Sequence, residues 1–298
     1  MTQTSLFGQV ATAMITPFTS TGELDIAGAQ ELATHLVGQG NDALVISGTT
    51  GESPTTSDTE KVTLLRAVIE AVGDRARIIA GAGSNNTEHT IELAQAAQKA
   101  GAHGLLLVTP YYNRPPQTGL QAHFTAVAEA TDLPIMLYDI PGRSGVPINV
   151  ETLVRLAEHP RIAAVKDAKG DLVAGSWVMA RTDLMYYSGD DALNLPWLSV
   201  GAVGFVSVAA HLVAAKLKTM REAFFAGDVA QAAATHRELL PVYEGIFRTQ
   251  GVITVKAALN AAGLPAGPVR LPLVDATEAE MVTLRADLVA GGVALPVA

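Results

Sequence analysis

Cysteine is absent from the 298-residue chain, which excludes disulfide bonds, thiolate metal ligands and a cysteine nucleophile. Charged residues are also scarce, at 16% of the chain, and the formal net charge is −9. We find no cluster of lysine and arginine with interleaved aromatic residues, so the positive surface that binds a nucleic-acid backbone is missing. We therefore do not expect a nucleic-acid partner, and a subunit interface would explain the lean charged surface.

Segments for export or membrane insertion are lacking as well. Residues 1–10 have neither the basic start nor the apolar core of an export signal, which predicts a cytoplasmic protein. Residues 192–215 contain no Asp, Glu, Lys or Arg over a length that could cross a bilayer. Because Pro196, Gly201 and Gly204 interrupt this stretch, we predict a helix, a strand and a second helix there rather than a membrane span.

Short apolar strands alternate with amphipathic helical segments over most of the chain. This alternation predicts right-handed βαβ units and a parallel sheet, and a count of eight strands favours closure into a (β/α)8 barrel over an open sheet. Helix-start residues precede three of the helical segments, at Asp25, Ser57 and Thr87, and Gly101 ends the third. The strands are expected to start near Val10, Ala43, Arg77, Gly104, Ile135, Ile162, Met185 and Val203.

After Gly227 the strand pattern stops and helical patterns follow, over residues 229–250, 252–262 and 278–290. We therefore predict an α/β protein in which residues 1–227 form the barrel that carries the active site, and residues 228–298 form a C-terminal helical domain. Such an extension is longer than closure of a barrel requires. Packing against the barrel and subunit assembly are both open roles for it.

Lys166 ends the apolar run at residues 162–165, which is typical of a buried parallel strand. An ammonium group among apolar neighbours loses hydration, which lowers its pKa from about 10.4 toward neutrality. The free amine that results attacks ketones, so Lys166 is a candidate for forming a Schiff base with a 2-oxo acid. A lone lysine that extends from the strand end to water is the structural alternative.

Polar residues follow several of the other predicted strands, and in barrels the reactive groups lie at these carboxyl ends. The loop from Gly48 to Gly51 offers backbone N–H groups and two hydroxyls, from Thr49 and Thr50, as a cradle for a carboxylate. Taken alone, this loop is more typical of a plain polar turn. On one rim with a strand-end lysine and two tyrosines, it can bind an acid and pass protons through hydroxyl groups.

Three further features bear on the chemistry. Arg143 is either a solvated loop residue or a bidentate partner for a second carboxylate. Asp190 and Asp191 lack the accompanying ligands of a metal site, so helix capping is the better account and no metal is expected. The segment Gly81-Ala82-Gly83 fails the dinucleotide-binding pattern because Asn86 occupies the last glycine position.

Together, these motifs resemble the dihydrodipicolinate synthase/N-acetylneuraminate lyase superfamily of class I aldolases, from Thr16 through Val208 and with a helical tail of the expected kind. The resemblance implies that Lys166 forms the pyruvate Schiff base. It also implies that Thr50 and its loop, with Gly48, bind the pyruvate carboxylate, and that the backbone at Gly189 and Val206 lines the pocket. The proton relay implied by the family consists of Thr49, Tyr138 and Tyr112, with Tyr112 reaching into the site of the neighbouring subunit.

The synthase branch of the superfamily uses an arginine at the position of Arg143 to bind aspartate 4-semialdehyde, and the sialic acid lyases lack it. The resemblance thus implies a lyase that condenses pyruvate with L-aspartate 4-semialdehyde to 4-hydroxy-tetrahydrodipicolinate, the first committed step of diaminopimelate and lysine biosynthesis. It implies no external cofactor and a homotetramer built as a dimer of dimers. The alternatives are another pyruvate-dependent aldolase, for keto-deoxy sugar acids or hydroxy-oxoglutarate, and a non-catalytic binding protein.

The resemblance also points to an allosteric pocket for lysine. His89 replaces a glutamate that would pair with the amine of the effector, and Lys61 adds a like charge. We therefore expect weak or no inhibition by lysine. The matching positions are Ser53, Pro54, Asp58, Lys61, Asn85, His89 and Tyr111.

Overall fold

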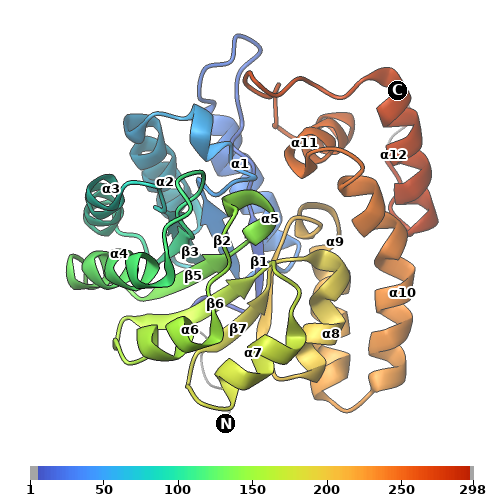
Figure 1. Ribbon diagram of the computed structural model, residues 1–298. Helices are drawn as coiled ribbons and strands as arrows, with labels where there is room; N and C mark the ends of the chain where they lie inside the picture. Colours follow the sequence, from blue (N-terminus) through green and yellow to red (C-terminus); the bar gives the residue numbers. More distant parts are fainter. Residues whose placement is uncertain (1–5, 296–298) are drawn as a thin grey trace.

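Eight parallel strands form a closed barrel in the computed structural model, which describes residues 6–295 (Figure 1). Neighbouring strands follow the order of the chain, and β8 pairs with β1 to close the barrel. The predicted (β/α)8 barrel is therefore confirmed. The strands are β1 (Val10–Ala13), β2 (Ala43–Ile46), β3 (Arg77–Gly81), β4 (Gly104–Val108), β5 (Ile135–Asp139), β6 (Ile162–Asp167), β7 (Met185–Ser188) and β8 (Gly204–Ser207).

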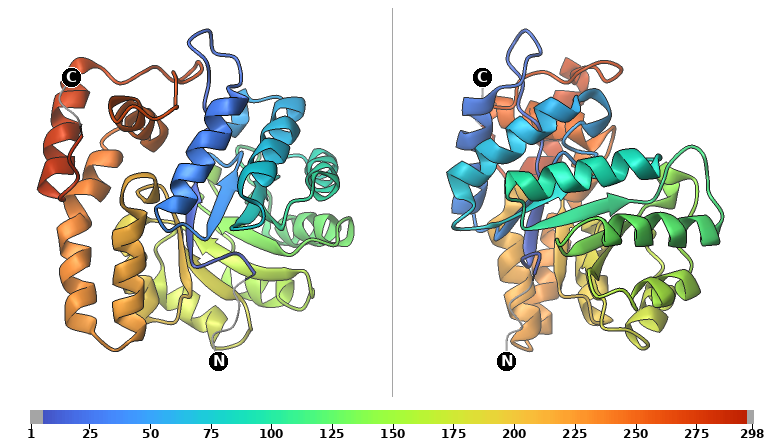
Figure 2. Two further views of the ribbon diagram at one scale, coloured as in Figure 1. Left: turned by 180° about the vertical axis from the view of Figure 1, so that it is seen from behind. Right: turned by 90° about the vertical axis from the view of Figure 1, so that its left-hand side faces the viewer.

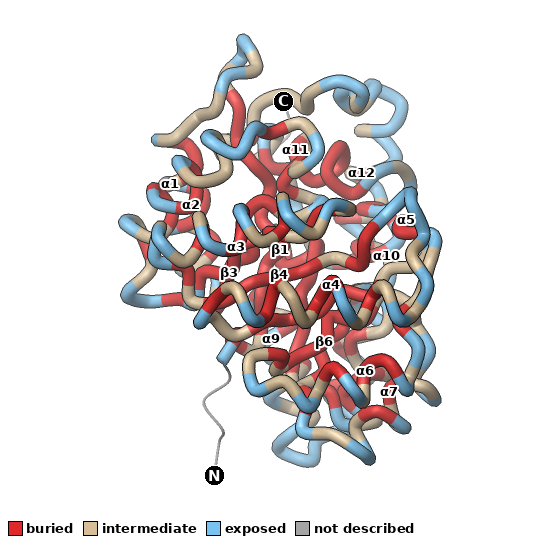
Figure 3. The backbone as a smooth tube through the Cα atoms, turned by 60° about the vertical axis from the view of Figure 1, so that its left-hand side comes forward, coloured by how far each residue is buried: buried red, intermediate tan, exposed pale blue. Residues whose placement is uncertain are grey.

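Burial on both faces explains why these strands read as nearly continuous apolar runs. Figure 3 shows the barrel buried and the outer sides of the surrounding helices exposed. In the register of the sheet, Lys166 on β6 lies beside Tyr138 on β5 and Tyr187 on β7. The strand-end lysine and one candidate relay tyrosine are thus neighbours across the sheet.

Helices connect the strands, and local capping fixes where they begin. Asp25 accepts a hydrogen bond from the Gly28 amide, and Ser57 forms a reciprocal capping box with Glu60. The third helix is capped by Asn86 and not by Thr87, because the Asn86 side chain accepts from the His89 amide. The helices are α1 (Ile26–Gly38), α2 (Asp58–Val72), α3 (Thr87–Ala100), α4 (Gln117–Glu129), α5 (Pro141–Ser144), α6 (Val150–Leu156), α7 (Leu172–Met179), α8 (Asn194–Ser199) and α9 (Ala210–Phe225), with short 3-10 helices η1 (Ser53–Thr55) and η2 (Asp191–Leu193).

The charge-free stretch at residues 192–215 forms the helix, strand and second helix that were predicted, as α8, β8 and the start of α9. Among residues 6–295, none of the helices combines the length and hydrophobicity that a bilayer crossing requires.

The C-terminal extension consists of α10 (Val229–Ile246), α11 (Gly251–Ala261) and α12 (Glu278–Ala290). The first of these ends four residues earlier than predicted, so residues 247–250 form a connection to α11. Helix α10 packs against α9 and α12 along one flank of the barrel, as Figure 2 shows from behind. The segment between α11 and α12 returns to the loop that follows β1, where the Phe18 amide donates to the Ala266 carbonyl at 3.2 Å. The extension therefore lies over the end of the barrel at which the strands have their carboxyl ends.

Candidate active site

A cavity of about 530 Å³ opens at the carboxyl end of the barrel strands. One part of its wall comes from the extension, through residues 247, 250–252, 272 and 273. The rest comes from strand ends and the loops that follow them, as the sequence predicted. Of the predicted catalytic and substrate-binding residues, the structure brings to this cavity Gly48, Thr49, Thr50, Tyr138, Arg143, Lys166 and Gly189.

Lys166 is buried, with 5% of its surface exposed, and its Nζ lies 4.1 Å from the centroid of the Tyr138 ring. The pKa of the amine is lowered to about 7, and burial is the largest cause. The charge of Arg143 also lowers this pKa, whereas the charge of Asp191 raises it. Near neutral pH a large fraction of Lys166 is therefore free amine. Gly189 makes room for this side chain, since a Cβ there would lie 2.9 Å from the Lys166 Cε.

Tyr138 is held firmly beside the lysine. The Thr109 amide and the Thr109 hydroxyl both donate to the Tyr138 carbonyl at 3.0 Å. Burial raises the pKa of the phenol to about 12, with Arg143 lowering it and Asp190 raising it. The hydroxyl therefore keeps its proton near neutral pH and is available as a proton donor.

The loop with Thr49 and Thr50 is a tight turn tied to its surroundings by backbone groups. The Glu52 amide donates to the Thr49 carbonyl at 3.1 Å, and the Ser53 amide donates to the Gly48 carbonyl at 3.2 Å. From the loop that follows β1, the Thr16 hydroxyl donates to the Gly51 carbonyl at 2.6 Å. The turn thus presents both threonines to the cavity from a fixed backbone.

Asp190 and Asp191 perform different tasks. Asp190 caps η2 by accepting from the Ala192 amide at 3.1 Å, which confirms the predicted capping role. Asp191 is a buried carboxylate that accepts from the Val208 and Ala209 amides at 3.0 and 2.9 Å, and from Asn194 and Ser207 side chains. The sequence did not reveal Asp191 as the charge that opposes deprotonation of Lys166. Within the described part of the chain, no group of three or more His, Asp or Glu residues is arranged to hold a metal ion.

Two of the predicted catalytic and substrate-binding residues do not line the cavity. Val206 is fully buried in β8, and Val208, two positions nearer the carboxyl end, lines the cavity instead. Tyr112 is 90% exposed at a backbone φ of 74°, outside the cavity of its own chain. A single chain therefore does not place Tyr112 beside Lys166.

The predicted allosteric positions lie in different surroundings. Ser53, Pro54 and Tyr111 line the large cavity, whereas Lys61 and His89 both contact Asp58. His89 Nε2 lies 2.8 Å from Asp58 Oδ2, and Lys61 Nζ lies 3.6 Å from Asp58 Oδ1. Asn85 accepts through its carbonyl from the Asn113 side chain at 2.8 Å.

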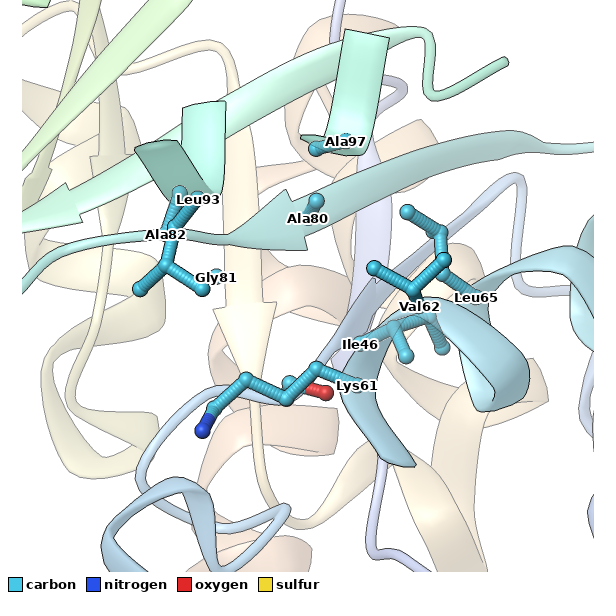
Figure 4. A pocket seen from close by; sticks show the side chains of 10 residues that line it. Ile46, Lys61, Val62, Leu65, Ala80, Gly81, Ala82, Leu93 and Ala97 are labelled. Atoms are coloured by element: carbon cyan, nitrogen blue, oxygen red, sulfur yellow. The ribbon is translucent and has the colours of Figure 1, made fainter. Parts of the chain in front are cut away.

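Lys61 also borders a second cavity of about 20 Å³ between α2, α3, β2 and β3, which is too small for a substrate. Figure 4 shows its amine directed away from Val62 and Leu65. This amine donates to the Thr56 carbonyl at 2.5 Å. Burial lowers the pKa of Lys61, while Asp58 raises it. Lys61 is therefore already engaged within its own chain.

Comparison with known proteins gives one consistent match. The model of the dihydrodipicolinate synthetase family matches residues 6–290. A 4-hydroxy-tetrahydrodipicolinate synthase 2 from Streptomyces coelicolor is 66% identical over 97% of this chain and 97% of that protein. A 4-hydroxy-tetrahydrodipicolinate synthase from Acidothermus cellulolyticus is 65% identical over 96% of this chain and 93% of that protein. The crystal structure of dihydrodipicolinate synthase from Cyanidioschyzon merolae with lysine bound has a TM-score of 0.94 at 46% identity, and covers 96% of this chain and 99% of that one.

Proposed function

The chain belongs to the dihydrodipicolinate synthetase family, and we propose that Lys166 is the amine through which it binds pyruvate. The protein is a lyase that condenses pyruvate with L-aspartate 4-semialdehyde to 4-hydroxy-tetrahydrodipicolinate, in diaminopimelate and lysine biosynthesis. The observation that carries the assignment of Lys166 is its position: a buried amine with a pKa of about 7 at the edge of the cavity, beside a protonated tyrosine.

The reaction begins when the free amine of Lys166 attacks the keto carbon of pyruvate. The keto oxygen leaves as water, and the product is a protonated imine. Loss of a methyl proton gives an enamine, whose carbon attacks the aldehyde carbon of the semialdehyde while the aldehyde oxygen takes up a proton. The amino group of the semialdehyde then displaces Lys166 from the imine carbon, which closes the ring and frees the enzyme. The protonated imine is the electron sink, so we propose that no external cofactor is needed.

The other residues of the cavity bind the two substrates and move protons. Thr50 and the amides of its turn, starting at Gly48, bind the pyruvate carboxylate, and the backbone at Gly189 borders the same place. Tyr138 and Thr49 carry protons to and from the reacting carbon and oxygen atoms. Arg143 lines the cavity and its guanidinium suits the carboxylate of the semialdehyde.

Arg143→Ala tests this division of roles. We expect the KM for aspartate 4-semialdehyde to rise roughly tenfold or more, in line with the loss of a charged hydrogen bond, while the KM for pyruvate stays near that of the unaltered enzyme. Steady-state rates with each substrate varied in turn measure both constants. An unchanged KM for the semialdehyde would remove Arg143 from the proposal.

We also propose that two chains share each active site. Tyr112 is exposed and lies outside the cavity of its own chain, so the proposed relay of Thr49, Tyr138 and Tyr112 is complete only when another copy supplies Tyr112. A dimer would then be the smallest active unit, within a homotetramer built as a dimer of dimers. We propose that residues 228–298 act as a helical domain in this assembly, and that the enzyme works in the cytoplasm, where pyruvate is available.

Lysine is proposed to inhibit this enzyme weakly or not at all. The relative from Cyanidioschyzon merolae has lysine bound. In this chain the Asp58 carboxylate is paired with both Lys61 and His89, so a lysine bound there with Ser53, Asn85 and Tyr111 would meet the Lys61 ammonium without an unpaired carboxylate. Initial rates at micromolar lysine measure this, and strong inhibition there would refute the proposal.

A further inference from the structure

A buried ion pair joins the extension to the turn of the active site. Lys256, in the middle of α11, places its Nζ 2.6 Å from Glu52 Oε1, and the two side chains are 2% and 1% exposed. Glu52 directly follows the turn with Thr49 and Thr50. Nothing in the mechanism above uses either charge.

Arg270, also from the extension, completes this cluster. Its backbone amide donates to Glu52 Oε2 at 2.8 Å, and its guanidinium donates to Glu60 at 2.6 and 3.1 Å. The Lys256 amine and the Arg270 guanidinium lie 4.1 and 4.0 Å from the centroid of the Phe18 ring. Lys256 also donates to the Pro268 carbonyl at 2.7 Å. We call Glu52, Lys256 and Arg270 the clamp.

The clamp acts on the backbone that carries the threonines. Glu52 has a left-handed backbone, with φ 54° and ψ 38°. This conformation is unfavourable for any residue that has a Cβ atom. Its amide closes the turn on the Thr49 carbonyl, and its own carbonyl accepts from the Thr55 and Thr56 hydroxyls. A shift of the Glu52 side chain would therefore move the turn.

Stability alone does not account for the pair. Taking both charges out of water offsets much of their attraction, so apolar side chains of similar volume often stabilise such a site equally well. What the ion pair does provide is a single geometry, because two charges and their hydrogen bonds fit in only one arrangement. That geometry is transmitted to Thr49 through one turn of backbone.

We propose that Lys256 and Arg270 position Glu52, and that the helical extension thereby fixes the Thr49–Thr50 turn at the pyruvate site. Glu52 borders the cavity, but its carboxylate is directed into the clamp. Glu52 and Lys256 are thus positioning residues. The inference rests on the proposed role of the two threonines in pyruvate binding.

The test compares Lys256→Met with a matched control, Lys216→Met, whose lysine on α9 also pairs with the extension. Lys216→Met also removes an ion-paired lysine, since Lys216 Nζ lies 2.7 Å from Glu238 Oε1 and donates to the Gly291 carbonyl at 3.0 Å, away from the turn. We measure kcat and KM for both substrates, with active sites counted by borohydride trapping at saturating pyruvate. Lys256→Met is expected to raise the KM for pyruvate roughly tenfold or more, as misplaced binding groups do, with kcat expressed per trapped site. Its KM for the semialdehyde, and both constants in Lys216→Met, should change by less than about twofold.

A double variant keeps the test informative if Lys256→Met folds poorly. Glu52→Gln combined with Lys256→Met leaves no unpaired buried charge, so it should fold, but it still lacks the ion pair. Its KM for pyruvate should therefore stay raised, and a return to the KM of the unaltered enzyme would count against the inference. A Lys256→Met enzyme that is only less heat-stable, with an unchanged KM for pyruvate, would overturn the inference. Failure of pyruvate to label Lys166 in the unaltered enzyme would instead overturn the proposed function.

Discussion

At the scale of single residues, the chemistry depends on a balance of three effects on one amine. Burial lowers the pKa of Lys166, Asp191 raises it and Arg143 lowers it, with a result of about 7. Free amine is needed for attack on pyruvate. A pKa near neutrality supplies a large fraction of free amine near neutral pH.

Replacement of Asp191 by asparagine tests this balance. Asp191→Asn removes the negative charge that raises the pKa of Lys166, so more free amine is present at a given acidic pH. The acidic limb of kcat/KM for pyruvate should move to lower pH, from its expected place near pH 7. A full pH profile separates this shift from a general loss of rate.

Asp190→Asn is the matched control for this pH profile, because Asp190 caps η2 and is not among the charges that set the pKa of Lys166. Equal shifts of the acidic limb in the two variants, or a shift of this limb to higher pH in Asp191→Asn, would show that Asp191 does not raise the pKa of Lys166.

At the scale of elements, α2 is tied to the extension by Glu60 and Arg270. The hydrogen bond from Arg270 lowers the pKa of Glu60 to about 2, although burial acts in the opposite direction. A carboxyl whose pKa is lower in the folded than in the unfolded chain stabilises the fold above its unfolded pKa of 4.5. That stabilisation is lost as the pH falls from 4.5 toward 2.

Glu60→Gln should therefore lower the free energy of unfolding at pH 7 by about 1 kcal/mol, a modest value because solvent screens this partly exposed pair. The difference between variant and unaltered enzyme should shrink as the pH falls below 4.5. Urea unfolding at pH 7 and at pH 3 measures it. Glu31→Gln, at an exposed position of α1, serves as the control. A difference that grows in acid would have the wrong sign for this account.

Element positions were largely predictable because strands and helices of a barrel differ in hydrophobic period. All eight strands begin within one residue of the predicted starts, and α12 has the predicted bounds. The polar strand ends that meet in the cavity followed from the rule for barrels. Sequence does not reveal which layer of a strand reaches the cavity, so the lining by Val208 was not predicted. Lys256 lies in an apolar run much like that of Lys166, and only the fold shows that its partner is Glu52.

At the scale of the whole molecule, the exposed Tyr112 requires a second chain if it acts in the relay. Tyr112→Phe should lower kcat by roughly a hundredfold, as loss of a proton-transfer group does, and Lys166→Met should abolish activity. Co-expression of the two variants makes hybrid dimers in which one site contains Lys166 of one chain and Tyr112 of the other. If Tyr112 acts across the interface, each hybrid dimer should have about half the activity of a dimer of the unaltered enzyme. No recovery in purified hybrids would mean that Tyr112 acts within its own chain, and full activity of Tyr112→Phe alone would mean that it does not act in the relay.

The most direct measurement of the central claim is reduction of the enzyme with borohydride in the presence of pyruvate, followed by mass mapping of its peptides. The account predicts one pyruvate-derived adduct per chain, on the peptide that contains Lys166, and none without pyruvate or in Lys166→Met. An adduct on another lysine such as Lys256 or Lys61, or no adduct at all, would contradict the proposal that Lys166 is the amine that binds pyruvate.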